Sequence, residues 1–332
     1  MTGMAYGVDP VLEIDFEREA EKIADKMRQI LSQDLHRRGF VIAMSGGIDS
    51  SVCAALAVKA LAVKAVENKK VFGLLMPEKD SSSSSGDLGK LLAEHLGIEY
   101  TVKNIASTLE AIGCYQWRDD AIRQVFPEYT SKWKNKIVIV GGIDGKINHY
   151  NIVVENPQGE RFEEMLPLKA YLTIVAATNH KQRVRKALEY FHADRLNYAV
   201  IGTPNRLEYD QGFFVKNGDG AADIKPISHL YKSQVYAMAK HLGLPDAICN
   251  TTPTTDTYSL EQGQDEFYFA LPYKKMDIAL WYLNNGKTEI ELAEKLDINP
   301  QQAKNIYKDI LAKRRTTRYL HLEPQLIENN IL

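Results

Sequence analysis

A turn rich in glycine and serine, AMSGGIDSS at residues 43–51, strongly limits the folds that this chain can adopt. It follows a short apolar run typical of a buried strand (40–44) and precedes a helical pattern over roughly 49–65. Two glycines let the backbone approach an anion closely, and the helix after them directs unpaired N–H groups at it. The hydroxyls of Ser45, Ser50 and Ser51 can add donors. The segment therefore predicts a strand–loop–helix unit that holds a phosphate group.

The same loop lacks the lysine that a P-loop carries, so the charge of a bound phosphate must be neutralised by neighbouring groups and metal. Asp49 is a hard oxygen ligand suited to Mg²⁺. A strand–turn–helix corner, whose glycines only permit the turn, is the alternative interpretation. The full SGGxDS pattern directly after a strand favours the loop that holds pyrophosphate.

Strands and helices alternate around this unit. VFGLL (71–75), GIEYTV (97–102) and YAVIGT (198–203) are typical of strands, and helical patterns cover about 86–96 and 168–194. This order predicts an α/β fold, a doubly wound parallel sheet of the Rossmann-like kind with helices on both faces.

Several other segments complete the expected layout. A helix is expected over 14–38, ended by Gly39, and five consecutive serines (81–85) indicate a linker or loop. Residues 134–165 contain two β-rich runs around a glycine-rich turn, which predicts an inserted β-hairpin. After residue 228 we expect a helical region with helices near 229–242, 261–283, 288–296 and 299–318. The chain then divides into a domain over 1–285, with the insert at about 134–165, and a helical extension over 286–332.

Composition narrows the class of protein. The 332 residues hold 41 basic and 43 acidic side chains, a net charge of −2 that gives no broad attraction to nucleic acid or anionic lipid. We expect no secretory signal at the amino terminus, and Lys59 and Lys64 interrupt the most apolar stretch (54–66), which is too short to span a membrane. The three widely spaced cysteines form neither a disulfide framework nor a metal motif. The expectation is a soluble cytoplasmic enzyme.

The SGGIDS motif resembles the signature of the N-type ATP pyrophosphatases, which cleave ATP between its α- and β-phosphates. Further motifs follow in order: NHKQRVR (179–185), GTPNRLE (202–208), GFFVKNGDGAADIKPI (212–227), LYKSQ (230–234) and PTTD (253–256). Together they look like the NAD synthetase family, over roughly residues 40–285. The resemblance implies an adenine nucleotide alpha hydrolase-like domain.

The resemblance also implies a reaction, catalysed by a ligase that forms a C–N bond. ATP and Mg²⁺ would drive the amidation of nicotinic acid adenine dinucleotide to NAD⁺ through an acyl-adenylate, with release of AMP and pyrophosphate. Because the chain has no room for a glutaminase domain after the synthetase core, ammonia is expected free or from a separate glutaminase. The family's subunits form a homodimer, so the resemblance implies a dimer here.

Site residues follow from the matched motifs. The expected metal ligands are Asp49 and Glu208, and Asp49 and Lys232 are the expected catalytic residues. The expected ATP-binding residues are Ala43, Met44, Ser45, Gly46, Gly47, Ile48, Asp49, Ser50, Thr203, Lys232 and Thr254. The expected substrate-binding residues are Arg183, Lys216, Asp223 and Lys313.

The chain departs from the family pattern at a few places. Ala43 replaces a glycine, Pro204 and Asn205 replace the more frequent Asp and His, and the segment after PTTD lacks a Lys-Pro pair. Lys313 is only a partial match to the family's His-Lys pair. These changes cluster where the acceptor would be held, so a paralogue that amidates another carboxylate, a uronic acid or a nucleotide-linked acid, is the alternative.

Two other functions receive less support. Relatives that transfer sulfur to tRNA usually need reactive cysteines and a basic RNA face, neither of which is clear here. Residues 288–318 resemble a helix-turn-helix, so an ATP-sensing DNA-binding regulator is conceivable. The near-neutral charge argues against nucleic acid as a partner. A helical hairpin packed on the core, with its KRR segment closing over a phosphate-bearing ligand, is the plainer interpretation.

Overall fold

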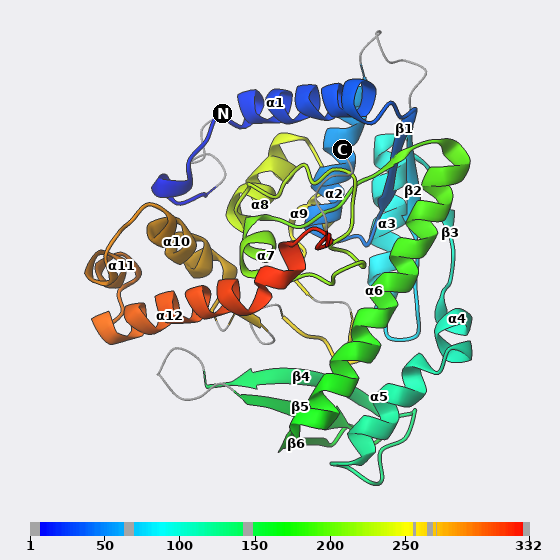
Figure 1. Ribbon diagram of the computed structural model, residues 1–332, viewed down its shortest axis with the longest axis vertical. Helices are drawn as coiled ribbons and strands as arrows, with labels where there is room; N and C mark the ends of the chain where they lie inside the picture. Colours follow the sequence, from blue (N-terminus) through cyan, green and yellow to red (C-terminus); the bar gives the residue numbers. More distant parts are fainter. Residues whose placement is uncertain are drawn as a thin grey trace.

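The main sheet has four parallel strands in the order β3-β2-β1-β7. Figure 1 labels three of them, β1, β2 and β3. The strands are β1 (Gly39–Ala43), β2 (Lys70–Leu75), β3 (Glu99–Val102) and β7 (Ala199–Val200). The computed structural model describes residues 7–62, 70–141, 149–254, 257–263, 268–269 and 271–327. The expected parallel α/β sheet is confirmed, although β7 is shorter than the strand expected over 198–203.

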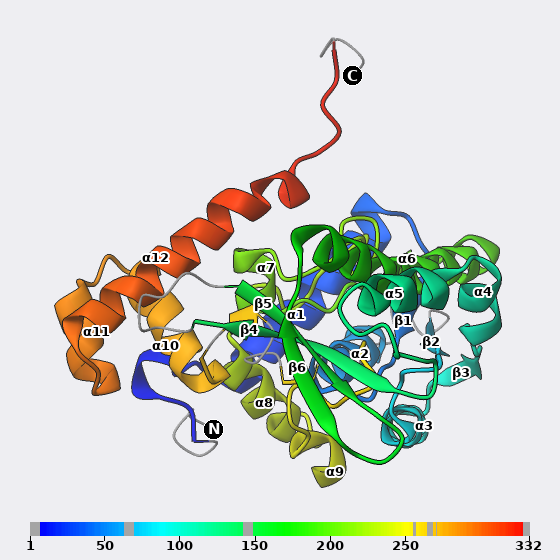
Figure 2. The ribbon, with the colours of Figure 1, turned by 90° about the horizontal axis from the view of Figure 1, so that it is seen from below.

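Helices cover both faces of this sheet, because successive side chains of a strand point to opposite sides. On β1, Phe40 and Ile42 enter the largest hydrophobic cluster, whereas Val41 enters a second one. The first cluster includes side chains of α1 (Phe16–Gln29), α2 (Ile48–Leu61) and α3 (Ser83–Leu96). The second includes side chains of α4 (Ala106–Ala111), α5 (Cys114–Arg123) and α6 (Leu168–Leu196). Because each face of the sheet is covered by its own set of helices, the sheet is doubly wound (Figure 2).

The amino-terminal helix is shorter than expected. A 3₁₀ turn (Pro10–Leu12) precedes α1, which ends at Gln29 and continues as a π-helical turn (Ile30–Asp34). Gly39 does not end this helix but begins β1. A Cβ atom at Gly39 would lie 2.2 Å from the Lys70 carbonyl oxygen, so close approach of β2 explains the glycine.

The serine run is not wholly a loop. Ser82 is the N-cap of α3, and its Oγ accepts a hydrogen bond from the Ser85 amide at 3.3 Å. Serine favours this position because its hydroxyl satisfies an otherwise free helix amide. The expectation of a linker is therefore wrong from Ser83 onward, where the helix begins.

The insert is a three-stranded antiparallel sheet in the order β4-β5-β6, made by β4 (Lys134–Val140), β5 (His149–Glu155) and β6 (Arg161–Met165). The expected pair of strands is confirmed, and β6 extends the hairpin by one strand. Most of the expected glycine-rich turn lies outside the described residues. Inward-facing Ile137, Ile152 and Val154 form a third hydrophobic cluster with residues of α5 and α6, so the insert packs on these two helices (Figure 1).

The carboxyl-terminal half is helical. It contains α7 (Arg206–Gln211), α8 (Lys232–His241), α9 (Asp246–Cys249), α10 (Tyr273–Asn284), α11 (Glu289–Leu296), α12 (Pro300–Thr317) and a 3₁₀ turn (Arg318–His321). Of the helix expected over 261–283, α10 covers the part from Tyr273, after Pro272, and residues 264–267 and 270 lie outside the described residues. Leu292 and Ile306 of α11 and α12 join the largest hydrophobic cluster, so the helical extension packs on the main body. No helix in the described part of the chain is long and apolar enough to cross a bilayer.

Candidate active site

The glycine loop joins β1 to α2 at the carboxyl edge of the sheet. β1 lies between β2 and β7, so the sheet extends from β1 in both directions and the strand order reverses at this point. Open α/β sheets bind ligands at such a switch point, at the carboxyl ends of the strands. Gly46 has φ +77°, and Gly47 is the N-cap of α2 without a side-chain cap. The first amides of α2 are therefore directed at whatever the loop holds.

Serine hydroxyls stabilise this loop from within. Ser50 Oγ lies 3.1 Å from Ser45 Oγ and donates to the Gly47 carbonyl at 3.0 Å. Ser51, which is fully buried, donates to the same carbonyl at 2.9 Å. Ser51 is thus a structural residue, whereas Ser45 and Ser50 line the large cavity in front of the loop.

That cavity has a volume of about 1470 Å³. The expected residues that line it come from the loop (43–50), from the loop after β7 and α7 (Thr203, Glu208), and from the segments that follow (Lys216, Lys232, Thr254), together with Arg183 of α6. The structure therefore brings together all the expected ATP-binding residues, both expected metal ligands and two of the four expected substrate-binding residues.

Lys232 and Asp49, which both line this cavity, form an ion pair. The Lys232 side chain is 2% exposed, and the Asp49 side chain is 17% exposed. Burial alone would lower the pKa of Lys232, but the nearby carboxylates of Asp49 and Glu208 outweigh it and hold this pKa above its ordinary value. Lys232 is therefore held as a cation beside the glycine loop, which has no lysine of its own.

Asn205 is a site residue that the sequence analysis noted only as a departure from the family pattern. Its Nδ2 donates to Asp49 Oδ1 at 3.0 Å, and its Oδ1 caps α7 by accepting from the Leu207 amide at 2.9 Å. In return, Glu208 Oε2 accepts from the Asn205 amide at 3.2 Å, which completes a capping box. The N-x-x-E spacing was the signal that could have identified it.

Asp277 of α10 is a second residue that sequence reasoning missed. Its carboxylate is fully buried and accepts from the amides of Lys232 (3.1 Å) and Ser233 (2.7 Å), and from Ser233 Oγ (2.6 Å). Burial raises its pKa to about 7. Asp277 caps the first turn of α8, which carries Lys232. Because this cap comes from α10, which is distant in sequence, no local sequence pattern predicts it.

Arg183 and Lys216 lie together on one wall of the cavity. Arg183 Nε donates to the Lys216 carbonyl at 3.2 Å. Lys216 Nζ donates to the carbonyls of Tyr319 (3.0 Å) and Leu322 (3.2 Å), so the chain after α12 also reaches this wall.

Asp223 and Lys313 are not among the residues that line the cavity. Asp223 Oδ2 accepts from the Val200 amide at 2.7 Å and so supports β7. Lys313 Nζ donates to the Tyr268 carbonyl at 2.6 Å and pairs with Asp309 at 2.5 Å. Arg314, next in the KRR segment, pairs with Asp210 at 2.6 Å. The first two residues of this segment thus make internal contacts.

The donor set suits a divalent cation that arrives with its ligand. Asp49 and Glu208 both line the cavity, and both lie near enough to Lys232 to affect its pKa. The described residues contain no cluster of three or more His, Cys, Asp or Glu side chains that could hold a metal ion by themselves. Mg²⁺ is usually held by one or two carboxylates together with phosphate oxygens and water, which this pair fits.

Comparisons with known proteins match most of the chain to one family. A family model described as NAD synthase matches residues 19–132 and 143–318. The chain is 55% identical over 318 residues to the NH(3)-dependent NAD(+) synthetase of Rhizobium meliloti (strain 1021), covering 96% of this chain and 93% of that protein. It is 34% identical over 257 residues to the protein of the same name from Thermotoga maritima, covering 77% of this chain and 83% of that protein.

Solved structures share the fold. The structure of an NMN synthetase from Francisella tularensis superposes with a TM-score of 0.64 at 22% identity, covering 95% of this chain and 99% of that chain. The NH3-dependent NAD synthetase from Campylobacter jejuni superposes with a TM-score of 0.60 at 24% identity, covering 95% and 100%. The family match leaves out residues 133–142, which include β4.

Proposed function

The chain belongs to the NAD synthase family, and from this membership we propose that it amidates nicotinic acid adenine dinucleotide to NAD⁺ with ATP and ammonia. The close relatives are named NH(3)-dependent NAD(+) synthetases, and the most similar of those described above aligns over nearly the whole chain. The observation that carries the proposal is the buried Lys232–Asp49 pair directly beside the glycine loop. It provides a fixed cation and a metal ligand where the phosphates of ATP would lie.

The first step of this reaction is adenylation. The carboxylate of the dinucleotide attacks the α-phosphorus of ATP, so a C–O–P bond forms and pyrophosphate leaves. The amides of the glycine loop and α2 bind the leaving pyrophosphate, and Lys232 compensates its growing charge. The protein thus accelerates the step by positioning and charge, and a nucleophilic side chain is not needed.

Mg²⁺ is the metal that we propose for Asp49 and Glu208. When bound, it would neutralise charge on the β- and γ-phosphates. Asn205 orients Asp49 through the bond from its Nδ2, which leaves the second carboxylate oxygen to Lys232. The pair of carboxylates is therefore held in place before the nucleotide arrives.

In the second step, ammonia attacks the activated carbonyl, the amide forms and AMP leaves. We place the acceptor near Arg183 and Lys216, whose side chains line the wall of the same cavity. Arginine can bind a phosphate or carboxylate through two parallel hydrogen bonds. We propose that Asp223 and Lys313 act on the acceptor site indirectly. Asp223 supports β7 by accepting from the Val200 amide, and Lys313 holds the segment at Tyr268 by donating to its carbonyl.

The buried cysteines of this chain support free ammonia, and not glutamine, as the nitrogen source. Cys53, Cys114 and Cys249 are all buried free cysteines, and burial raises the pKa of each. None has the exposed thiolate character that a glutaminase nucleophile needs. Reduced thiols also support a cytoplasmic location, which we include in the proposal.

We include a homodimer as well, formed through the outer face of α5 and α6. Leu168 is 71% exposed, Leu172 55% and Trp117 45%, and they line a shallow cavity with His180 and Arg183. Contiguous exposed apolar side chains of this kind mark contact surfaces. Because Arg183 borders both this face and the large cavity, a second subunit there would stand next to the acceptor.

The proposal is tested by incubating the purified protein with ATP, Mg²⁺ and ammonium, with and without nicotinic acid adenine dinucleotide. NAD⁺ is followed by mass spectrometry, and AMP and pyrophosphate are quantified. Equal amounts of NAD⁺, AMP and pyrophosphate, formed only with the dinucleotide, are expected. Nicotinic acid mononucleotide, which has the same carboxylate without the adenylate half, is the control acceptor. Failure of a folded, ATP-binding protein to form NAD⁺ would point to another carboxylate.

A further inference from the structure

Residues 257–262, here called the wall segment, form one side of the large cavity. The segment follows Thr254 closely in sequence, and Thr254 lines the same cavity. It has no regular secondary structure of its own, so other parts of the chain must hold it in position.

Strand β4 holds the wall segment from one side. The Leu260 amide donates to the Asn135 carbonyl at 3.1 Å, and the Asn135 amide donates to Ser259 Oγ at 2.8 Å. Further along β4, Lys136 Nζ donates to the Glu261 carbonyl at 3.2 Å, and Gln262 Nε2 donates to the Ile137 carbonyl. The wall segment thus runs along the free edge of the inserted sheet.

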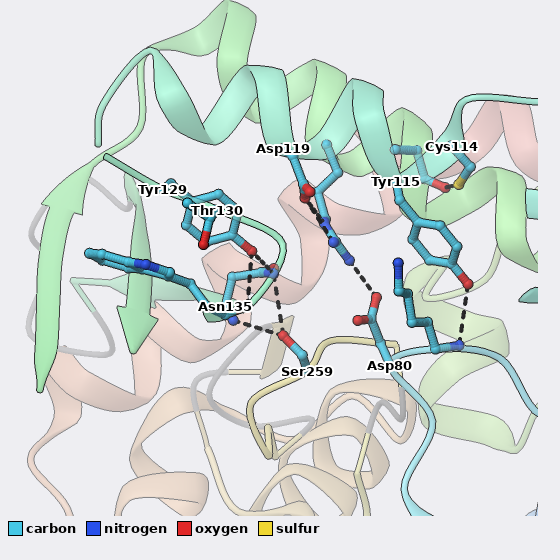
Figure 3. A network of polar contacts seen from close by, with 12 residues as sticks. Asp80, Cys114, Tyr115, Asp119, Tyr129, Thr130, Asn135 and Ser259 are labelled. Atoms are coloured by element: carbon cyan, nitrogen blue, oxygen red, sulfur yellow. Dashed lines mark hydrogen bonds and ion pairs between the residues drawn. The ribbon is translucent and has the colours of Figure 1, made fainter. Parts of the chain in front are cut away.

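Asn135 is at the centre of these contacts. It is fully buried, and its Nδ2 donates to the Tyr129 hydroxyl at 2.8 Å and to Ser259 Oγ at 3.3 Å. Figure 3 shows Tyr129, Asn135 and Ser259 joined in this way. Ser259 Oγ therefore accepts hydrogen bonds from both the main-chain amide and the side-chain amide of Asn135. Removal of the Ser259 hydroxyl would leave the buried main-chain amide of Asn135 without this acceptor.

Two further contacts fix the other end of the wall segment. Tyr258 is 5% exposed and joins the hydrophobic cluster beneath the inserted sheet. The buried Lys181 of α6 donates to the Thr257 carbonyl at 3.0 Å and to Glu78 at 3.0 Å, and it pairs with Asp80. Glu78 and Asp80 belong to the loop between β2 and α3, and α3 packs against Gly46 of the glycine loop.

We propose that β4 is a positioning element for the nucleotide side of the cavity, with Asn135 and Ser259 as positioning residues that fix the wall segment for ATP. This inference rests on the proposed function. The family model does not match β4, so the role inferred here is carried by a strand outside the motifs on which the family resemblance rests. Lys181, which holds Thr257, also bonds Glu78 and pairs with Asp80 in the loop before α3, and α3 packs against Gly46. The wall segment is therefore tied to the side of the cavity where the glycine loop lies, which is the side proposed for the nucleotide.

The test uses Ser259→Ala in the full chain, with Ser259→Thr as the conservative variant that keeps the hydroxyl and Ser107→Ala on the exposed side of α4 as the matched control. For Ser259→Ala, we expect the KM for ATP to rise roughly tenfold while kcat changes less than about twofold. A tenfold change corresponds to about 1.4 kcal/mol, which is within the range of the net contribution of one hydrogen bond. Ser259→Thr should restore the wild-type KM, and Ser107→Ala should match the wild type.

Hydrogen–deuterium exchange without substrates provides a readout independent of catalysis. Peptides that cover 257–262 should exchange faster in Ser259→Ala, while peptides over the glycine loop keep their wild-type rates. Unchanged exchange of 257–262, or an unchanged KM for ATP, would overturn the inference. If Ser259→Ala does not fold, Lys136→Met removes an exposed contact to the same segment and should give a smaller change of the same sign; no change there also overturns it.

Failure of the proposed function would look different. Wild-type protein would then form no NAD⁺, and the effect of Ser259→Ala on direct ATP binding, measured by titration calorimetry, would still decide the role of β4.

Discussion

Lys232 and Asp49 are 183 residues apart in the chain, yet the Lys232 ammonium pairs with the Asp49 carboxylate beside the glycine loop. The two partners differ in exposure, since Lys232 is 2% exposed and Asp49 17%. Loss of either partner therefore has unequal consequences for folding, which can be measured.

Asp49→Asn should lower the free energy of unfolding more than Lys232→Met does. Removing one partner of a buried ion pair costs about 3–5 kcal/mol. Asp49→Asn removes the carboxylate that pairs with the buried Lys232 ammonium and leaves Glu208 as the remaining nearby negative charge. Lys232→Met leaves a carboxylate that Asn205 still contacts and water can reach. Urea titrations measure the free energy of unfolding of both variants. Lys240→Met, on the same helix α8 as Lys232, is the control. Both site variants should lose pyrophosphate release by about 100-fold or more. The opposite order of stability would contradict the assignment.

Glu208→Gln separates metal binding from helix capping. Glutamine preserves the capping box of α7 but removes the charge, so stability should change by less than about 0.5 kcal/mol. The Mg²⁺ concentration for half-maximal activity should rise about tenfold or more, because one anionic ligand is lost. Glu208→Ala removes both functions and should also lower Tm. A Mg²⁺ dependence that is unchanged in Glu208→Gln would exclude this residue as a ligand.

Gly46→Ala and Gly47→Ala form a matched pair in the loop. At Gly46, φ is +77° and an added Cβ would lie 2.7 Å from Leu88 Cβ and from the Ser85 carbonyl oxygen, so we expect a loss of about 2 kcal/mol or more. At Gly47, φ is −76° and the nearest atom would be Ser45 Oγ at 3.3 Å, so Tm should stay near the wild type. Thermal unfolding of the two variants checks this; equal losses would show that α3 does not constrain the loop.

Asp277 should make stability depend on pH. Its pKa is about 7 in the folded state against an ordinary value of 3.8, so the folded protein holds an extra proton between about pH 4 and 7. Its stabilising contribution is complete below pH 4 and is lost as the pH rises through 7. Asp277→Asn should flatten the pH dependence of Tm in this window, whereas Asp246→Asn on the exposed start of α9 should not. An unaltered slope in Asp277→Asn would contradict the assigned pKa.

Leu172→Asp should convert the proposed dimer into a monomer. The charge would stand in the apolar face of α6, where its desolvation opposes association. Sedimentation velocity should show about half the wild-type mass, with kcat reduced because Arg183 borders the same face. Ile290→Asp on α11 is the control, since Ile290 is 61% exposed elsewhere on the molecule. A wild-type protein that is monomeric would refute the dimer directly.

The parts of the fold that follow local rules could be predicted from the sequence. The glycine loop combines a buried strand, a φ-permissive turn and a helix start within a few residues, and its surroundings were identified correctly. The family motifs then located Lys232 and Glu208, which the fold brings to the same cavity as Asp49.

The missed features depend on contacts between distant segments. Asp277 is an unremarkable acid in an amphipathic helix until α10 packs against the start of α8. Strand β6 has five exposed residues, so its sequence lacks the apolar alternation that reveals a strand. Lys313 matched a motif by position, but its ammonium binds the Tyr268 carbonyl. Such pairings depend on tertiary packing, which periodicity does not encode.

The position of β7 has a consequence for how the protein is made. β1 is a central strand that is complete at residue 43, but its second neighbour begins only at residue 199. During synthesis the apolar β1 therefore keeps one open edge until all of α6 has been translated. Open strand edges pair readily with other chains. Truncations that end before residue 199 carry the entire phosphate loop, and yet their central strand offers the geometry for self-association and aggregation.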